Sequence, residues 1–272
     1  MRTFVLDDSE TKLASGKRFS PAPERAHYLL RVLRLSQGAV FPGQDSRGKR
    51  YLITLESETP CTLSLRREEE ASAREVEACF RELPEQGPDF PPIIFYQAIL
   101  KGKKMDQVIR QATEAGADFI IPVLTDRSVP QFTPGEAEKK QKRWEIIVRE
   151  AIQQSGATGT TLLLPRSLKK VIEDPPMPRP QGGGREVKLF FHERPIANGS
   201  LHGYLSGEIS SITAAVGPEG GFSPKESEMF LQAGFCPLFF SGNILRAETA
   251  AIYGLAAIRA LVAERDIWRL VQ

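Results

Sequence analysis

The chain has few of the residues from which metal centres and disulfide frameworks are built. Its 272 residues include only three cysteines and three histidines. Cys61, Cys79 and Cys236 are widely separated, and neither they nor the histidines show the spacing of metal ligands. We therefore expect no metal site, and we expect the cysteines to pack as free thiols in a reducing compartment.

Long hydrophobic runs are also missing. No apolar stretch approaches the roughly 20 residues that a helix needs to cross a bilayer. The segment from Met1 to Asp8 lacks the apolar core of a secretory signal. With 41% hydrophobic and 26% charged residues, the composition is that of a globular chain. We expect a cytoplasmic protein without a membrane partner.

A large excess of positive charge is absent as well. The formal net charge is only +2 at pH 7, whereas a strongly basic balance is typical of many nucleic-acid-binding domains. If this chain binds RNA, its positive charge must therefore be gathered on one face.

Prolines and a glycine mark a boundary between two domains. They fall between Glu82 and Pro92, where the sequence ELPEQGPDFPP interrupts any regular element. Before it, short alternating runs at 51–55 and 61–65, separated by turn signals such as that at 46–48, predict a small β-rich, barrel-like domain. We expect this domain to span residues 1–80, a linker 81–92, and a second domain 93–272.

The second domain has the alternation of strands and helices that favours a parallel α/β sheet. The predicted strands are 93–99, 119–123, 187–191, 212–216 and 238–240. The predicted helices are 105–112 ended by Gly116, 144–152 ended near Gly156, one that begins at the capping box Ser223–Glu226, and 248–262. Residues 174–185 are predicted to form a surface loop.

Two motifs in the last third point to a ligand. Residues 215–222 read AVGPEGGF and residues 242–251 read GNILRAETAA. Gly217, Gly220 and Gly221 let backbone N–H groups approach a ligand that side chains would block. Each motif follows a predicted strand, so we expect a small-molecule pocket at the carboxyl edge of the sheet.

This ordered pair of motifs resembles the signature of the SPOUT superfamily of knotted, S-adenosylmethionine-dependent RNA methyltransferases. Within it, the chain is most similar to the small-subunit rRNA (uridine-N3)-methyltransferase family. Three further stretches fit: KGKKMD at 101–106, DRS at 126–128 and HYLLRVLRL at 27–35. The resemblance implies a trefoil-knotted methyltransferase domain after a PUA-like RNA-binding barrel. It also implies S-adenosylmethionine as cofactor, a homodimer, and methylation of uridine N3 in 16S rRNA, free or in the assembled small subunit.

The predicted cofactor site combines both motifs. The glycine turn offers backbone groups, and residues 244–250 offer apolar walls; by resemblance, residues 191–193 form a further loop of the same pocket. The predicted cofactor-binding residues are Phe191, His192, Glu193, Gly217, Glu219, Gly220, Gly221, Ile244, Leu245, Arg246, Thr249 and Ala250. The alternative is that the motifs are an ordinary strand-to-helix turn and an ordinary helix start.

Three residues are candidates for catalysis. Methylating uridine N3 requires loss of its proton and places negative charge on the uracil carbonyl oxygens, which a guanidinium stabilises. Arg246 is the first candidate, and its alternative is a salt bridge with Glu248 or Glu219. Glu248 either accepts a proton, orients Arg246, or simply favours the first turn of the last helix. Arg127 faces the target base or a phosphate, or is a solvated loop arginine.

Basic residues in two places are candidates for RNA contact. Lys101, Lys103 and Lys104 precede a helix, which suits a phosphate, although a solubilising loop is the alternative. His27, Arg31 and Arg34 are spaced to share one helical face. By resemblance these three and Arg2 contact RNA; without it they are surface charges.

The sequence departs from the family at several positions. Gln111, Ala115 and Ala157 stand where the family usually has lysine, leucine and arginine, and residues 241–243 read Ser-Gly-Asn instead of the common Gly-Pro-Arg. The missing basic groups leave two alternatives open. One is a SPOUT methyltransferase acting on another rRNA or tRNA nucleotide, and the other is a non-catalytic RNA-binding paralogue.

Overall fold

The computed structural model divides the chain into two compact units. They are residues 1–86 with 152–159, and residues 87–151 with 160–272. The structure describes residues 3–6, 8–12, 17–45, 48–81, 90–128, 134–157, 159–176, 184–196, 199–240 and 242–266. Most of the predicted linker and most of the predicted surface loop at 174–185 lie outside the described residues.

The first unit is built on a five-stranded sheet. Its strands are β1 (Phe4–Val5), β2 (Arg18–Phe19), β3 (Val40–Gln44), β4 (Arg50–Glu58) and β5 (Cys61–Arg67), in the order β1-β3-β4-β5-β2. Only the β1–β3 pair is parallel among the described pairs. Alternate residues of β4 and β5 enter an apolar core formed by Phe4, Leu6, Leu29, Phe41, Tyr51, Ile53, Leu55, Leu63 and Leu65. The predicted β-rich organisation of this part is confirmed.

Short helices accompany this sheet, and they change the prediction for His27, Arg31 and Arg34. They are α1 (Asp8–Thr11), α2 (Pro23–His27), the π-helical turn η1 (Tyr28–Val32), the 3-10 turn η2 (Glu68–Glu70) and α3 (Ala73–Phe80). A π-turn has a wider period than an α-helix, and Arg34 lies beyond it with φ at +54°. The prediction of one α-helical face for the three is wrong, although all three side chains are exposed.

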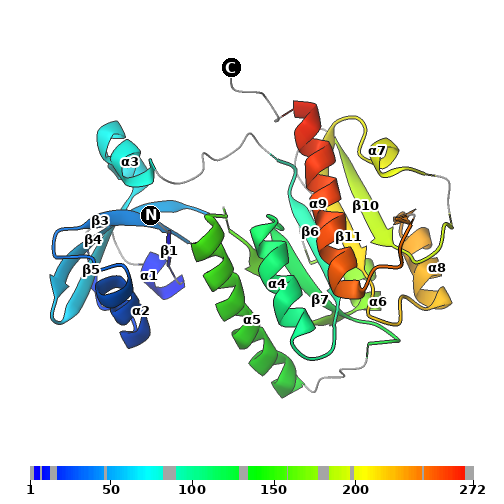
Figure 1. Ribbon diagram of the computed structural model, residues 1–272, viewed down its shortest axis with the longest axis horizontal. Coiled ribbons are helices and arrows are strands. Elements are labelled where there is room, and N and C mark those ends of the chain that lie inside the picture. The colour runs from blue at the N-terminus through cyan, green and yellow to red at the C-terminus, as the bar shows by residue number, and fades with distance from the viewer. Residues whose placement is uncertain are drawn as a thin grey trace. The chain divides into compact units, whose positions relative to one another are not determined.

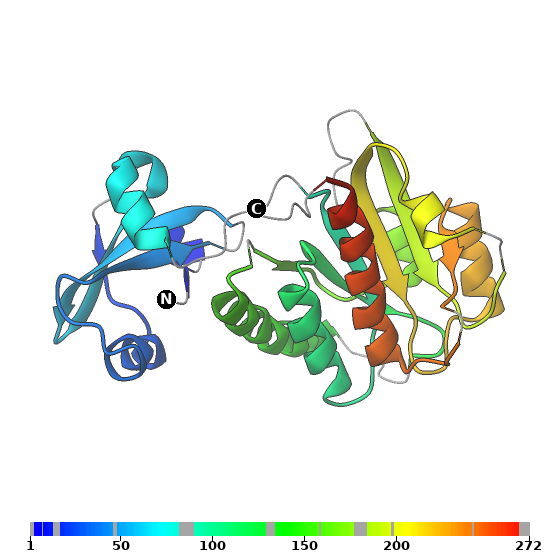
Figure 2. The same cartoon turned by 45° about the horizontal axis from the view of Figure 1, so that its top comes forward.

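The second unit contains a sheet whose described strand pairs are all parallel. Its strands are β6 (Ile93–Ala98), β7 (Phe119–Leu124), β8 (Thr161–Leu162), β9 (Arg166–Ser167), β10 (Arg185–Phe191), β11 (Ile209–Val216) and β12 (Cys236–Leu238). The order is β12-β10-β11-β6-β7-β8, and β9 also pairs with β7. The predicted parallel α/β sheet is confirmed (Figures 1 and 2).

Helices cover both faces of this sheet. They are α4 (Lys104–Glu114), α5 (Pro134–Ser155), α6 (Leu168–Glu173), α7 (Leu201–Tyr204), α8 (Pro224–Gln232) and α9 (Ala247–Asp266). Helices α4 and α9 lie side by side over one face (Figure 1). On the other face α6 and α8 close a core made of Ile94, Tyr96, Ile121, Val123, Leu168, Val171, Phe190, Ala215, Phe222, Phe230 and Phe235. No described helix is long and apolar enough to cross a membrane.

The predicted ends of several elements hold. Gly116 and Gly156 follow α4 and α5 with φ values of +77° and +73°, as left-handed helix ends require. The predicted strand 238–240 is placed wrongly, because β12 ends at Leu238, whose carbonyl accepts a hydrogen bond from the His192 N–H at 2.9 Å. The apolar run at 238–240 gives no sign of where strand pairing stops, and Phe239 and Phe240 follow the strand.

Helix α9 also reaches the far end of α4. The Arg259 guanidinium donates a hydrogen bond to the Gly116 carbonyl at 3.1 Å and lies 4.3 Å from the ring centre of Phe90. Burial lowers the pKa of Arg259, although the nearby Asp118 carboxylate opposes this shift. The left-handed φ of Gly116 favours glycine there, and a Cβ at this position would also displace the guanidinium, which lies 2.5 Å away.

A glycine brings α9 into close contact with the sheet. A Cβ on Gly254 would lie 2.2 Å from the ring of Phe191, the last residue of β10. The absence of a side chain therefore lets the ring pack directly on the helix backbone. We expect this contact to fix the position of Phe191.

Gly254→Ala is expected to lower the free energy of unfolding by about 1–3 kcal/mol, because the added methyl group overlaps the Phe191 ring. The better helix propensity of alanine, about 1 kcal/mol, offsets only part of this. The matched control is Gly135→Ala in α5, where nothing lies within 4 Å of the added group. Urea unfolding measures both variants, and equal midpoints would contradict the packing argument.

Candidate active site

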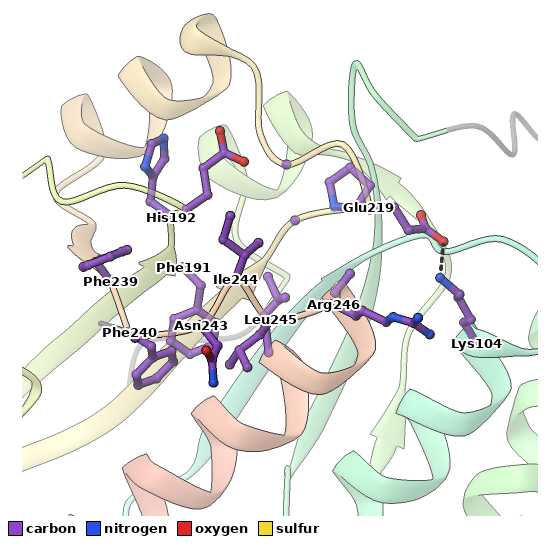
Figure 3. Close-up of a pocket in the computed structure, with 18 residues that line it drawn as sticks. Lys104, Phe191, His192, Glu219, Phe239, Phe240, Asn243, Ile244, Leu245 and Arg246 are labelled. Atoms are coloured by element: carbon purple, nitrogen blue, oxygen red, sulfur yellow. Dashed lines mark ion pairs between the residues drawn. The ribbon is translucent and has the colours of Figure 1, made fainter.

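A cavity of about 480 Å³ opens where three neighbouring strands end. Strand β10 leads into residues 191–193, β11 into 217–221 and β12 into 239–240. Residues 242–247, which precede and begin α9, complete the wall (Figure 3). Parallel strands all end at the same edge of their sheet, so segments far apart in sequence meet here.

The cavity collects the residues predicted to bind a cofactor. All of them line it except Gly220 and Thr249. The prediction did not include the other lining residues, which are Lys104, Val216, Pro218, Phe239, Phe240, Gly242, Asn243 and Ala247. For Phe239 and Phe240 the available signal was their place directly after the short strand β12.

The glycine turn keeps its backbone close to the cavity. The Gly221 N–H donates to the Pro218 carbonyl at 2.9 Å, and Gly221 has a φ of +67°. A Cβ on Gly217 would lie 3.3 Å from the Phe222 nitrogen. A side chain would therefore strain this turn at Gly221 and crowd it at Gly217, which is why glycines form this part of the wall.

Arg127 supports this turn from behind. Its Nη1 donates to the Gly220 carbonyl at 2.7 Å and to the Phe222 carbonyl at 3.3 Å. The arginine is not among the residues that line the cavity. The sequence suggested that Arg127 contacts the target base or a phosphate, or is a solvated loop arginine. In the structure it instead stabilises the backbone of the glycine turn.

A buried carboxylate joins the same two loops. Glu226 is 3% exposed, and its oxygens accept hydrogen bonds from the backbone N–H groups of Asp126 at 2.7 Å and Ser223 at 2.8 Å. The Ser223 hydroxyl donates to the Asp126 carboxylate at 2.7 Å. The predicted capping box at the start of α8 is confirmed. It also ties the loop after β7 to the loop after β11.

A lysine between two carboxylates lies at one end of the cavity. Lys104 Nζ is 3.4 Å from Glu219 Oε1 and 3.4 Å from Glu248 Oε2 (Figure 3 shows the Glu219 pair). Glu219 also accepts a hydrogen bond from the Lys101 N–H at 3.3 Å. Partial burial raises the pKa of Glu219. The hydrogen bonds from backbone N–H groups and from Lys104, with the charge of Lys104, outweigh that effect and leave the pKa below its ordinary value.

Arg246 lines the cavity and is exposed. The salt bridge expected as its alternative role is not formed, because Lys104 pairs with both Glu219 and Glu248 instead. Among the described residues the Arg246 side chain has neither an ion pair nor a hydrogen bond. Figure 3 shows it extending along the cavity toward Lys104. Its guanidinium is therefore available to a ligand.

Aromatic and aliphatic side chains form the other wall. The Phe191 ring lies 5.5 Å from that of Phe240, which lies 4.8 Å from that of Tyr253. Ile244 is 92% exposed. The cavity thus has a charged end and an apolar end.

The remaining predicted site residues lie elsewhere. Glu248 is close to the cavity through Lys104 but does not line it. Lys101 and Lys103 are exposed on the turn before α4, while His27, Arg31 and Arg34 belong to the first unit. Arg2 lies outside the described residues. Within the described part of the chain, no group of three or more His, Cys, Asp or Glu side chains is placed to hold a metal ion.

The fold and the cavity define a class of protein. The structure of a ribosomal RNA small subunit methyltransferase E from Neisseria gonorrhoeae, bound to S-adenosyl methionine, superposes with a TM-score of 0.72. The superposition covers 96% of this chain and 98% of that one at 23% identity. The fold is therefore that of solved rRNA methyltransferases.

Sequence comparison leads to the family. The pattern of the RNA methyltransferase domain matches residues 88–259. Ribosomal RNA small subunit methyltransferase E from Synechocystis sp. is 30% identical over 95% of this chain and 82% of its own length. The Bacillus subtilis protein of that name is 25% identical over 95% of this chain and 96% of its own length. The chain belongs to this family of RNA methyltransferases, as the two motifs predict.

Glu226→Gln is expected to lower the free energy of unfolding by about 1–3 kcal/mol, since an amide nitrogen would replace one acceptor and leave a buried N–H unpaired. Glu228→Gln is the matched control, because Glu228 is exposed on the same helix. Denaturant unfolding measures both changes. A Glu226 variant as stable as the control would show that the bridge between the loops adds nothing.

Lys104→Met is expected to raise the pKa of Glu219 toward its ordinary value. A carboxylate whose pKa is lowered by folding stabilises the fold above its unfolded pKa, and this contribution is lost as the pH falls through the folded value. The free energy of unfolding of the wild type should therefore exceed that of the variant by at most about 1 kcal/mol at pH 7, since the Lys104–Glu219 pair is partly exposed. The difference should shrink below pH 4.

Unfolding curves at pH 7 and at about pH 3.5 measure this difference, the lower value lying below the ordinary glutamate pKa. Lys103→Met is the control, because that exposed lysine has no ion pair among the described residues. A difference that does not vary with pH would contradict the assigned pairing.

Proposed function

We propose that this chain transfers a methyl group from S-adenosylmethionine to N3 of a uridine in the 16S rRNA of the small ribosomal subunit, in the cytoplasm. The observation that carries the proposal is the cavity at the ends of β10, β11 and β12. It gathers nearly all residues predicted for the cofactor in a chain of the rRNA methyltransferase family. The names of the relatives supply the substrate class.

The cavity fits the cofactor in size and chemistry. About 480 Å³ is within the range of small-ligand pockets, roughly 300–1,000 Å³. Phe191, Leu245 and Ala250 offer an apolar surface to the adenine, while Gly217 and Gly221 leave backbone groups accessible. When bound there, S-adenosylmethionine supplies an electrophilic methyl group on a sulfonium.

Arg246 is the proposed catalytic residue. Uridine N3 must lose its proton to solvent before it bonds to the methyl carbon, whose bond to sulfur would break with the electron pair left on sulfur. The negative charge of the deprotonated base spreads onto the uracil oxygens. An unpaired guanidinium on the cavity wall stabilises that charge and lowers the pKa of N3. Lys104 lies at the same end of the cavity, where Glu219 and Glu248 balance its charge, so the stabilising charge is assigned to Arg246.

The other two candidates act through neighbours. Glu248 pairs with Lys104 and does not line the cavity, so we assign it the role of holding the lysine rather than of accepting the N3 proton. Arg127 braces the glycine turn through two carbonyl groups. Both are positioning residues in this proposal.

The wider architecture follows the family in our proposal. Residues 1–80 are a PUA-like RNA-binding domain joined by the segment 81–92 to a SPOUT domain at 93–272. Its carboxy-terminal segments are threaded into a trefoil knot. The return of the chain from the edge strand β12 to α9, which packs on α4, supports this topology. Exposed Ile244 and Tyr253 beside the cavity support a homodimer.

Methyl transfer tests the function directly. Small subunits that lack the native modification are incubated with labelled S-adenosylmethionine, and their nucleosides are then separated. Labelled N3-methyluridine supports the proposal. Label in another nucleoside, or in tRNA alone, would point to a different target. Cofactor binding absent by calorimetry, with RNA binding intact, would identify a non-catalytic paralogue.

Arg246→Ala is expected to lower kcat by about 10²–10³-fold, the usual effect of removing one oxyanion-stabilising donor, with a much smaller effect on cofactor affinity. Arg246→Lys should recover part of the rate, because it keeps the charge but loses the planar donor fork. Single-turnover methyl transfer and calorimetry separate the two quantities. A variant with unchanged kcat would exclude the proposed role.

A further inference from the structure

We propose that the first half of α5 binds the phosphate backbone of the substrate RNA beside the cavity. This surface, the α5 basic surface, consists of Lys139, Lys140, Lys142 and Arg143. It continues toward the cavity through Lys101 and Lys103 on the turn before α4. The inference rests on the proposed function, because it assigns the path that the RNA takes to that site.

Two segments of this surface carry an excess of positive charge. Residues 136–143 carry four basic and two acidic side chains, an excess of two, and residues 101–104 carry three lysines. These two segments therefore hold a charge of +5, whereas the whole chain has only +2, so all the other residues together carry −3. These two segments thus carry a local excess of positive charge, as contact with an RNA backbone requires.

The lysines on this surface are not neutralised within the protein. Lys139, Lys140 and Lys142 are exposed and have no ion pair among the described residues. A shallow hollow of about 300 Å³ is lined by Lys139, Lys140, Arg143 and a single carboxylate, that of Glu136. Three cations around one concavity suit an anionic group such as a phosphate.

Helix α4 fixes this surface next to the active site. One oxygen of Asp106, in the first turn of α4, pairs with the Arg143 guanidinium. The other accepts a hydrogen bond at 3.1 Å from the indole N–H of Trp144, which is 2% exposed. Figures 1 and 2 show α5 running beside α4. Rigid contacts thus hold the basic residues of α5 beside the helix end that carries Lys103 and Lys104.

The same helix end leads into the cavity. Lys104 lines the cavity and pairs with Glu219 and Glu248, and the exposed Lys101 and Lys103 lie on the turn directly before it. On the α9 side the exposed groups near the cavity include the apolar Ile244 and Tyr253 as well as the cation Arg246. A uridine placed in the cavity brings the phosphates of its neighbouring nucleotides to one side or the other, and the α4–α5 side offers them several exposed lysines, namely Lys101, Lys103, Lys139, Lys140 and Lys142.

The test compares two variants with equal changes in charge. Lys139→Gln with Lys140→Gln removes two cations from the α5 basic surface. Lys169→Gln with Lys170→Gln removes two adjacent exposed lysines from α6, on the opposite face of the sheet. Affinity for 16S rRNA and for assembled small subunits is measured over a range of salt concentrations, with thermal unfolding as the check on folding.

We expect the α5 variant to bind RNA more weakly and to have a flatter salt dependence. The slope of log affinity against log salt should fall by about 1.4–1.8, since each lost phosphate contact removes about 0.7–0.9. The α6 variant should keep the wild-type slope. At saturating RNA, methyl transfer by the α5 variant should proceed at the wild-type rate, since none of the altered residues lines the cavity.

Three results would overturn the inference. If the α5 variant has the same salt slope as the wild type, and the wild type methylates its substrate, the α5 basic surface does not bind RNA. The proposed function is then unaffected. A loss confined to assembled subunits, with naked rRNA bound normally, would mean that α5 contacts a ribosomal protein. A wild type that binds no RNA would overturn the function and this inference together.

Discussion

The parallel direction of the strands is the constraint on which the site depends. Because β6, β7, β10, β11 and β12 all end at one edge, five loops that are distant in sequence are forced into a single neighbourhood. Their backbones carry polar groups that the sheet no longer pairs, and glycines at two positions keep these groups accessible. A chain with antiparallel strands at these positions would have divided the same loops between two edges.

Electrostatic contacts then decide how those loops are held. Glu226 and Arg127 join the loop after β7 to the loop after β11 through backbone groups, which makes the bridge independent of neighbouring side chains. Lys104 joins three segments through two carboxylates. This pairing leaves Arg246 as a cation with no internal partner in the described part of the cavity. The loops around the cavity are therefore held in place by hydrogen bonds and ion pairs, while the charge of Arg246 has no partner among the described residues.

Much of this site follows from sequence, because short motifs determine local backbone geometry. The parallel sheet, the capping box of α8 and the residues of the glycine turn are examples. Pairing between distant side chains was not predictable in this way. No spacing rule links Lys104 to Glu248 or Arg127 to Gly220, since each pair depends on how loops meet in three dimensions. The π-turn after His27 was missed because its residues also fit an α-helical period.

The two ends of α4 are both attached to α9. Glu248, in the first turn of α9, meets Lys104 at the start of α4, and Arg259, three turns later, meets Gly116 after its end. Contacts at both ends of α4 thus hold it against α9. The end of α4 at the cavity and its end at the amino-terminal edge of the sheet are therefore connected through one helix, α9.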